Sequence, residues 1–220
     1  MDRAQQELLR RAASVIGHDL RNPMAIINNS VYFVRAKLPA DGVDPKVEKH
    51  LKIIESEIAR ADRLLTDMLT FSRPYLPAAE TKDFDPFIES RVKEYPLPEG
   101  GKIDFKPEAK GARSRFDPAA LGDALRRLLD NAFFAMGDKG TVKVSTHSVK
   151  DTVVACVADS GPGVDAKIKD DLYEAFMTTK PKGLGLGLSL ARKYLEGNGG
   201  SITHETGPKG ASFRLILPAI

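Results

Sequence analysis

Apolar residues recur every three or four positions through the first third of the chain, a spacing that is typical of amphipathic helices. Two such stretches flank a connection between Pro39 and Pro45. On a helical wheel, the first stretch gathers its apolar residues within roughly 40° of the side opposite His18, and they are Leu9, Ile16, Leu20, Ile27, Val31, Val34 and Leu38. The second stretch places on one face Val47, Leu51, Ile54, Ile58, Ala61, Leu65, Met68 and Phe71. The chain is therefore predicted to begin with an antiparallel hairpin of two long helices.

A hairpin of two helices cannot cover both of its own apolar stripes. A second hairpin from another copy of the chain would complete a four-helix bundle, so we expect a homodimer. The competing possibility is that the stripes bury against the second half of the same chain.

The segment from Gly17 to Met24 reads GHDLRNPM and places a histidine, a carboxylate and a proline in the middle of the first predicted helix. The stripe opposite His18 directs this histidine away from the core, and Asn22, one turn later, shares its face. Asp19 lies about a quarter turn around the helix, within reach of the imidazole. Pro23 lacks a backbone donor and is expected to bend the helix. This setting favours a functional His18 over a histidine packed in a core or left on a bland surface.

Composition limits the possible classes of protein. A chain of 220 residues with 42% hydrophobic and 29% charged residues fits one or two soluble globular domains. The net charge of +3 is small and its basic residues are mixed with acidic ones, so we expect no nucleic-acid partner. The single cysteine, Cys156, excludes a disulfide framework, favours a reducing compartment and is expected to be buried in a strand.

The sequence contains no signal peptide, and no apolar run approaches the ~20 residues that a membrane span needs. We therefore expect this segment to be cytoplasmic and without membrane contact, with any anchor lying in a longer parent protein.

Residues 72–77 read SRPYLP, which ends the second helix and marks a linker. Beyond Thr81, helical stretches at 86–95 and 118–136 alternate with short strand-like runs at 103–105, 113–116, 141–148, 152–159, 200–206 and 211–218. The connection at 148–151 is too short for a crossover helix. We predict an α/β layered domain with a largely antiparallel sheet.

Two glycine-rich segments of the second half indicate ligand binding. DSGPG at 159–163 follows a strand, so Asp159 stands at its end and the glycines allow backbone to approach a planar ligand. GLGLGL at 183–188 leads into a helix over about 189–196, and Lys180 and Lys182 precede it. Free amides at such a helix start bind anions. The run is neither a Walker P-loop nor GxGxxG, so phosphate binding by another fold is indicated.

Asn131 lies in the helical segment RRLLDNA. Its neutral oxygen could serve a magnesium ion that keeps most of its waters and bridges phosphates. Alone, an asparagine in a helix is usually just exposed.

Together these segments resemble the sensor histidine kinases of two-component signalling, over nearly the whole chain. HDLRNP is similar to the H-box, RLLDNA to the N-box, DSGPGVD to the G1 box, YEAFMTTK to the F-box, GLGLGL to the G2 box and GPKGASFRLILP to the last glycine box. The short lid and the spelling MTTKPKG look most like the nitrogen-regulation type.

The resemblance implies a dimerisation and histidine phosphotransfer hairpin at 1–73, a linker at 74–80 and an ATP-binding α/β sandwich with a mixed, largely antiparallel sheet at 81–220. It makes His18 the phosphoacceptor, Asp19 the acidic neighbour that helps take its proton, and Asn22 a residue that supports dephosphorylation of a partner.

For the second domain, the resemblance implies binding of ATP and Mg²⁺. Asn131 would bind the metal, Asp159 would accept from the adenine amino group, and the segment from Phe176 to Gly187 would be the lid. The implied nucleotide-binding residues are Asn131, Asp159, Gly161, Gly163, Phe176, Thr179, Lys180, Gly183, Gly185 and Gly187. The implied partner is the receiver domain of a response regulator, to whose aspartate the phosphoryl group passes.

Three positions depart from the family pattern. Arg127 replaces an asparagine that many members carry one turn before the metal ligand, and it could contact phosphate or face solvent. Phe134 replaces a frequent lysine, and Asn198 stands where the family usually has histidine, a change that we interpret as neutral. Two other functions stay open: a non-kinase ATPase of the same superfamily, and a signalling scaffold without turnover.

Overall fold

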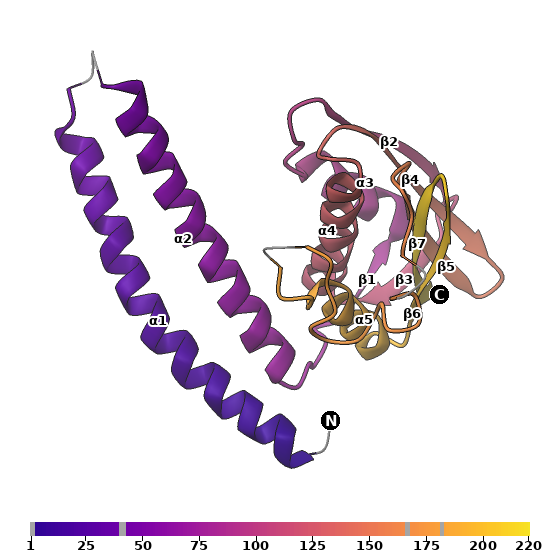
Figure 1. Ribbon diagram of the computed structural model, residues 1–220. Coiled ribbons are helices and arrows are strands. Elements are labelled where there is room, and N and C mark those ends of the chain that lie inside the picture. Colours follow the sequence, from indigo (N-terminus) through magenta and orange to yellow (C-terminus); the bar gives the residue numbers. More distant parts are fainter. Residues whose placement is uncertain (1–2, 40–42, 166–167, 181–182) are drawn as a thin grey trace. The chain divides into compact units, whose positions relative to one another are not determined.

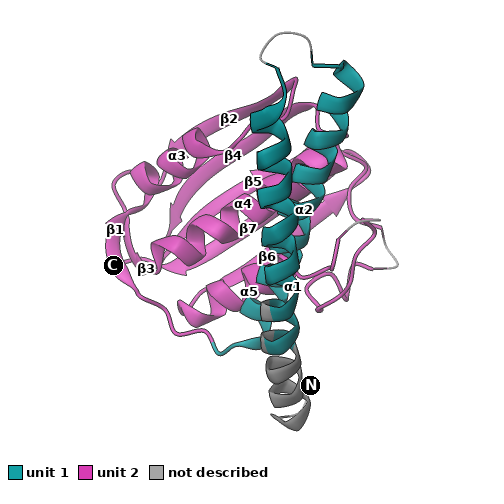
Figure 2. Cartoon of the chain, turned by 90° about the vertical axis from the view of Figure 1, so that its left-hand side faces the viewer, with its two compact units in different colours: residues 1–74 teal, residues 75–220 magenta. Residues whose placement is uncertain are grey.

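The computed structural model describes residues 3–39, 43–165, 168–180 and 183–220, without the side chains of residues 3–12, 14 and 18 (Figure 1). Within the chain, contacts separate two compact units, Met1–Pro74 and Tyr75–Ile220, which are coloured separately in Figure 2. No helix in the described part is long and apolar enough to cross a membrane.

Unit 1 is a hairpin of two helices, α1 (Arg3–Lys37) and α2 (Pro45–Ser72), as the spacing of apolar residues predicts. Pro23 lies inside α1, and the helix continues through it. Asp44 caps α2 by accepting a hydrogen bond from the amide of Lys46 at 2.8 Å. The backbone donor that Pro23 lacks therefore does not end α1. In contrast, α2 begins at a side-chain cap.

Polar contacts join the two helices of unit 1 next to their connection and again near the middle of the hairpin. Arg35 pairs with Glu48 and Glu55, each at 3.0 Å, and Arg21 pairs with Asp62 at 3.0 Å. The buried residues of α2 are Leu51, Leu65 and Leu69. Other large apolar side chains of the hairpin remain exposed, so the hairpin does not bury its own stripes. The dimeric bundle that would cover them stays a prediction.

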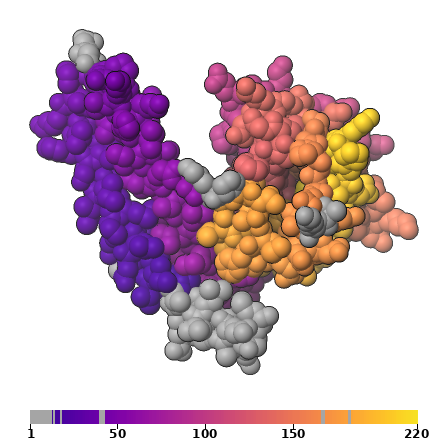
Figure 3. All heavy atoms as spheres, in the orientation of Figure 1, coloured from indigo at the N-terminus to yellow at the C-terminus, as the bar shows by residue number. Residues whose placement is uncertain are grey.

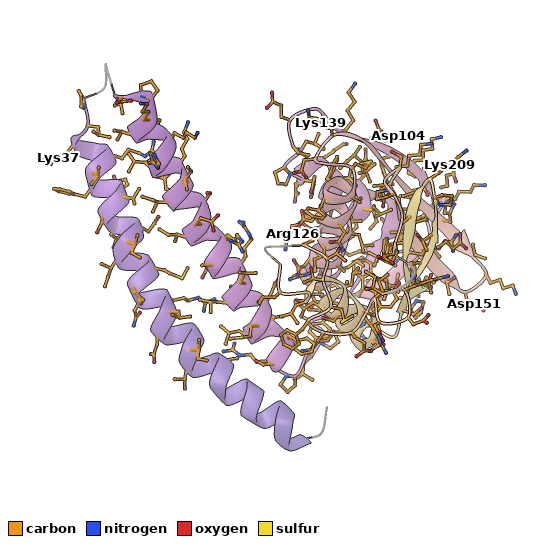
Figure 4. The ribbon with its side chains drawn as sticks, viewed as in Figure 1. Lys37, Asp104, Arg126, Lys139, Asp151 and Lys209 are labelled. Atoms are coloured by element: carbon orange, nitrogen blue, oxygen red, sulfur yellow. The ribbon has the colours of Figure 1, made fainter. Side chains whose placement is uncertain are left out.

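Unit 2 contains a five-stranded sheet in the order β2-β4-β5-β7-β6. The strands are β2 (Gly101–Glu108), β4 (Gly140–Val149), β5 (Thr152–Ala158), β6 (Ser201–Gly207) and β7 (Gly210–Pro218). Only the β2–β4 pair is parallel, so the sheet is mixed and largely antiparallel, as predicted. Asp151 lies in the tight β4–β5 connection and points outward, as does Lys139 before β4 (Figure 4).

Three helices cover one face of this sheet: α3 (Phe84–Glu94), α4 (Pro118–Ala135) and α5 (Gly187–Gly197). Alternate residues of the strands bury against them, which gives β7 its regular alternation of buried and half-exposed positions. The fully buried large side chains include Phe84, Phe116, Leu128, Leu190 and Leu215. This helix-on-sheet core holds α4 and the start of α5 in fixed positions.

Two findings differ from the sequence analysis. A short strand β1 (Glu80–Asp83) pairs antiparallel with β3 (Arg113–Phe116), although ETKD has no apolar pattern that predicts a strand. Cys156 was expected to be buried and is only half-buried, because it lies on the helix-free face of β5. Its Sγ is 3.1 Å from the hydroxyl of Ser212 on β7.

Candidate functional site

The amide of Asn131 is held by α4, whose start is fixed by Asp117. The Asp117 carboxylate accepts from the amides of Ala119 and Ala120 at 3.0 and 3.2 Å, which caps the helix. Nearly four turns later, Asn131 Oδ1 accepts a hydrogen bond of 2.6 Å from Nζ of Lys180. A residue of the predicted lid thus contacts the predicted metal ligand.

The ammonium group of Lys180 has a second partner on α4. Its Nζ lies 4.5 Å from the centroid of the Phe134 ring, within the range of a cation–π interaction. Burial lowers the pKa of Lys180, while the carboxylates of Asp130 and Asp138 act in the opposite direction and favour its charged form. The lysine is thus a partly desolvated cation beside acidic groups.

The turn after β5 is built around Asp159. Its Oδ1 accepts from the amides of Gly161 at 2.9 Å and Ala211 at 3.2 Å. Among the described residues, Oδ2 has no hydrogen-bond partner and remains able to accept from a ligand. The carboxylate is therefore oriented by backbone donors on one oxygen only.

Close backbone packing explains the glycines at this turn. A Cβ on Gly161 would come within 2.9 Å of the carbonyl oxygen of Ala135 at the end of α4. Gly163 has a φ of +79°, and a Cβ there would lie 2.2 Å from the carbonyl oxygen of Gly207. The turn therefore lies directly between α4 and the β6–β7 end.

The segment between β5 and α5 folds back on itself at the surface of unit 2, where Figure 3 shows it in orange. The amide of Phe176 donates to the carbonyl of Gly185 at 3.1 Å, and the amide of Gly183 donates to that of Lys180 at 3.2 Å. Gly185 has a φ of +70° and would clash with Met177 if it carried a Cβ. The phenyl ring of Phe176 is half exposed. Lys182 lies outside the described residues.

The first turn of α5 presents backbone donors. Its N-cap is Leu186, which makes no side-chain cap hydrogen bond, and Gly187 begins the helix with open space where a Cβ would lie. The amides of such a turn have no partner within the helix and attract anions. Thr179, also expected to bind nucleotide, is exposed in the lid segment.

Arg127 does not face solvent. Only 8% of it is exposed, and its Nε donates to Asp123 at 2.8 Å. Arg126, which points away from the sheet in Figure 4, bridges Asp123 and Asp130, and the hydroxyl of Tyr95 donates to Asp130 at 2.9 Å. Burial and the neighbouring Asp130 carboxylate raise the pKa of Tyr95. The polar face of α4 before Asn131 is therefore a connected network of ion pairs.

A second hydrogen-bond network joins the start of α4 to the end of α5, and the sequence analysis missed it. Asn198 accepts from the amide of Asp117 at 2.7 Å and donates to the hydroxyl of Tyr75 at 3.0 Å. That hydroxyl and the amide of Ala78 donate to Asp117 Oδ2 at 3.1 Å. Burial raises the pKa of Asp117, but the hydrogen bonds from the amides of Ala120 and Ala78 and from the Tyr75 hydroxyl outweigh it, and the pKa lies below its ordinary value. Asn198, interpreted as neutral, therefore joins two helices to the segment entering unit 2.

The residues predicted for phosphotransfer lie in unit 1. His18 is in α1, and its side chain is outside the described part. Asp19 and Asn22 are exposed on the same helix. The structure thus brings together Asn131, the turn after β5 and the lid within unit 2, and it places the H-box residues on unit 1.

Comparison with known proteins gives matches along most of the chain. A family model described as "Histidine kinase-, DNA gyrase B-, and HSP90-like ATPase" matches residues 116–220, and one described as "His Kinase A (phospho-acceptor) domain" matches residues 8–74. Sensor histidine kinase ZraS of Klebsiella oxytoca is 28% identical over 96% of this chain and 46% of its own length. Histidine-protein kinase AtoS of Escherichia coli is 28% identical over 92% of this chain and 34% of its own length. The chain spans less than half the length of these curated relatives.

Solved structures share the fold. Full-length ShkA in complex with AMPPNP aligns with 95% of this chain and 46% of its own, with a TM-score of 0.78 at 19% identity. The catalytic domain of the histidine kinase ThkA aligns with 64% of this chain and 95% of its own, with a TM-score of 0.57 at 26% identity.

Proposed function

Because this chain belongs to the sensor histidine kinases of two-component signalling, we propose that it is the catalytic core of such a kinase. Unit 2 would bind ATP with Mg²⁺, and His18 of unit 1 would receive the γ-phosphoryl group. The proposal is supported above all by the way the lid and the turn after β5 both pack against α4. The main contact is the hydrogen bond of 2.6 Å between Lys180 and Asn131. The nitrogen-regulation type stays a prediction.

The nucleotide would be held at both of its ends. Asp159 Oδ2 would accept from the adenine amino group, with Gly161 and Gly163 providing backbone close to the base. The amides at the start of α5, from Gly187 onward, would bind phosphate oxygens. Lid residues would enclose the distal phosphates, and they are Phe176, Thr179, Lys180, Gly183 and Gly185.

The donors present fit a magnesium ion. Asn131 Oδ1 already carries a positive group, the ammonium of Lys180, so the oxygen is placed and oriented to hold a cation. The described residues contain no cluster of three or more acidic, histidine or cysteine side chains that could enclose a metal. Mg²⁺ suits such a site because it keeps several waters and takes its other ligands from phosphates. When bound, it would offset the negative charge of the phosphates.

Transfer requires an imidazole nitrogen of His18 to approach the γ-phosphorus in line with the bond that breaks. The carboxylate of Asp19 would orient the ring and accept the proton from its other nitrogen. The product is a phosphohistidine, whose phosphoryl group would pass to an aspartate of a response-regulator receiver domain. Asn22 can donate and accept hydrogen bonds, so it would orient a water for hydrolysis of the regulator's acyl phosphate.

We also propose that the hairpin forms a homodimer and that this segment works in the cytoplasm. The support for the dimer is the set of exposed apolar side chains along the hairpin, since a contiguous apolar surface of this kind marks an interaction site.

Incubation with γ-labelled ATP and Mg²⁺ tests the function. We expect label on the protein that is stable to alkali and labile to acid, and lost in His18→Gln while nucleotide affinity is retained. Hydrolysis without retained label would support a non-kinase ATPase instead. Absence of nucleotide binding would support a scaffold.

A further inference from the structure

We infer that Lys180 is an exchangeable cation of the nucleotide site. Its ammonium group would hold the Asn131 oxygen until Mg²⁺ arrives with a nucleotide and takes that oxygen over. The inference rests on the proposed function, because it needs Asn131 to be the metal ligand.

Lys180 has two defined contacts on α4. Nζ lies 2.6 Å from Asn131 Oδ1 and 4.5 Å from the centre of the Phe134 ring. Lys180 is half-buried, whereas Thr178 and Thr179 before it in the lid are exposed. The side chain is therefore turned onto α4 and held there by two contacts of different kinds.

The ammonium group and a metal ion compete for one oxygen. Mg²⁺ binds oxygen ligands at about 2.0–2.1 Å in a near-ideal octahedron. A metal at Oδ1 and an ammonium nitrogen at its present distance would place two positive charges within a few ångströms of each other. An amide oxygen has no net charge to offset them. Metal binding at Asn131 therefore requires Lys180 to leave.

The fate of the displaced group depends on the nucleotide. On leaving, Lys180 gives up a charge-assisted hydrogen bond and the contact with Phe134. The γ-phosphate of ATP can replace both as a partner for the ammonium group. ADP lacks that group, so the loss is not compensated. The exchange would therefore disfavour Mg-ADP relative to Mg-ATP and promote release of the product.

The contact can be tested without nucleotide, by acylating lysines with N-hydroxysuccinimide acetate and measuring each site by peptide mass spectrometry. Lys180 should react several-fold more slowly than Lys106, which is exposed on the edge strand β2. Asn131→Ala and Phe134→Leu should each accelerate acylation of Lys180 and leave Lys106 unchanged. Equal rates at the two lysines, with no effect of either variant, would overturn the inference.

The exchange is tested by titrating Mg²⁺ against ADP and against a non-hydrolysable ATP analogue. In Lys180→Met, the Mg²⁺ concentration that half-saturates ADP binding should fall about three- to tenfold, the equivalent of one net hydrogen bond. Binding of the ATP analogue should weaken. Phe134→Leu should lower the half-saturating Mg²⁺ concentration for ADP by a smaller factor. Lys106→Met should change neither this concentration nor the binding of the ATP analogue.

Two failures are distinguishable. An unchanged or raised half-saturating Mg²⁺ concentration for ADP in Lys180→Met would overturn the exchange, because a lysine that only binds phosphate gives that result. Wild-type protein that binds neither nucleotide would overturn the proposed function, whereas the acylation rates report on the lysine contact independently.

Discussion

The hairpin of unit 1 keeps large apolar side chains on its surface, whereas the sheet and helices of unit 2 enclose theirs. Ile16, Leu20 and Ile27 of the predicted stripe on α1 are 45%, 46% and 47% exposed, while Phe84 and Phe116 of unit 2 are fully buried. Apolar surface removed from water contributes about 25 cal/mol per Å², so unit 1 forgoes a large part of its possible stabilisation as a single chain. Unit 2 has the core of an independent fold, and unit 1 needs something to cover its stripes.

Unit 2 also exposes some apolar side chains, among them Leu76, Leu97 and Val149, and three others lie in or next to the predicted lid. Phe134, Phe176 and Met177 belong to the end of α4 and the predicted lid. An exposed apolar group beside convergent polar groups is typical of a ligand site. Exposed apolar surface therefore predicts a protein partner for the hairpin of unit 1, whereas next to the lid of unit 2 it predicts a bound nucleotide.

A charge in the stripe of unit 1 gives the largest expected effect. Ile27 is 47% exposed on the predicted dimer face. In a two-fold dimer the change occurs twice, so Ile27→Glu should weaken association by about 10²- to 10⁴-fold, given about 1.5–3 kcal/mol per buried side chain. Sedimentation equilibrium measures it, with Asn29→Glu on the opposite side of α1 as the matched control. A monomeric wild type would show that the dimer prediction is wrong.

Substitutions in the two units should separate binding from chemistry. Asn131→Ala should remove Mg²⁺-dependent ATP binding without changing the hairpin. Asp19→Asn should keep ATP affinity and slow phosphorylation by roughly 10²-fold, as expected for loss of a proton acceptor. Calorimetric titration and single-turnover labelling measure the two effects. Equal ATP affinity in wild type and Asn131→Ala would contradict the metal-ligand role.

The Asn198 network offers a smaller test, confined to the stability of unit 2. Asn198→Ala leaves the buried amide of Asp117 without its acceptor, and such a loss costs about 1–3 kcal/mol of unfolding free energy. Tyr75→Phe removes only the hydroxyl and should cost less. The Tyr75 hydroxyl will not ionise in the accessible range, since burial, followed by the Asp117 charge, raises its pKa to about 12. Urea unfolding, followed separately in each unit, measures this loss of unfolding free energy. A loss in unit 1 would contradict the assignment of the network to unit 2.

Local sequence patterns predicted most helices and strands of both units. They did not predict contacts between residues that lie far apart in the chain. The hairpin of unit 1 follows from apolar spacing, and the β4–β5 pair follows from a short turn. Asn198 could not be interpreted correctly, because its partners Asp117 and Tyr75 lie 81 and 123 positions away in the chain. Strand β1 is polar and depends on pairing with β3, and the parallel β2–β4 pair joins strands separated by α4. Resemblance, more than spacing, identified Asn131 and the lid.

The smallest expected effect concerns His204 of β6, whose ring is partly buried in unit 2. Its Nδ1 lies 3.0 Å from the hydroxyl of Tyr173, its ring stacks on Phe213, and its Nε2 has no partner among the described residues. Burial, followed by the positive charge of Lys169, lowers the pKa of His204 below its ordinary value of 6.5. The unfolded chain therefore binds the proton more readily than the folded one between these two pKa values.

The stability that neutral His204 contributes is consequently present above pH 6.5 and is lost as the pH falls through its lower, folded pKa. The melting temperature of unit 2 should fall as the pH is lowered from 7.5 to 5.5, and His204→Phe should flatten that slope because a phenyl ring keeps the stacking without titrating. His50→Phe on α2 of unit 1 is the matched control, since that histidine is exposed and should leave the slope of unit 2 unchanged. An equal slope in wild type and His204→Phe would assign the pH dependence of unit 2 to other groups.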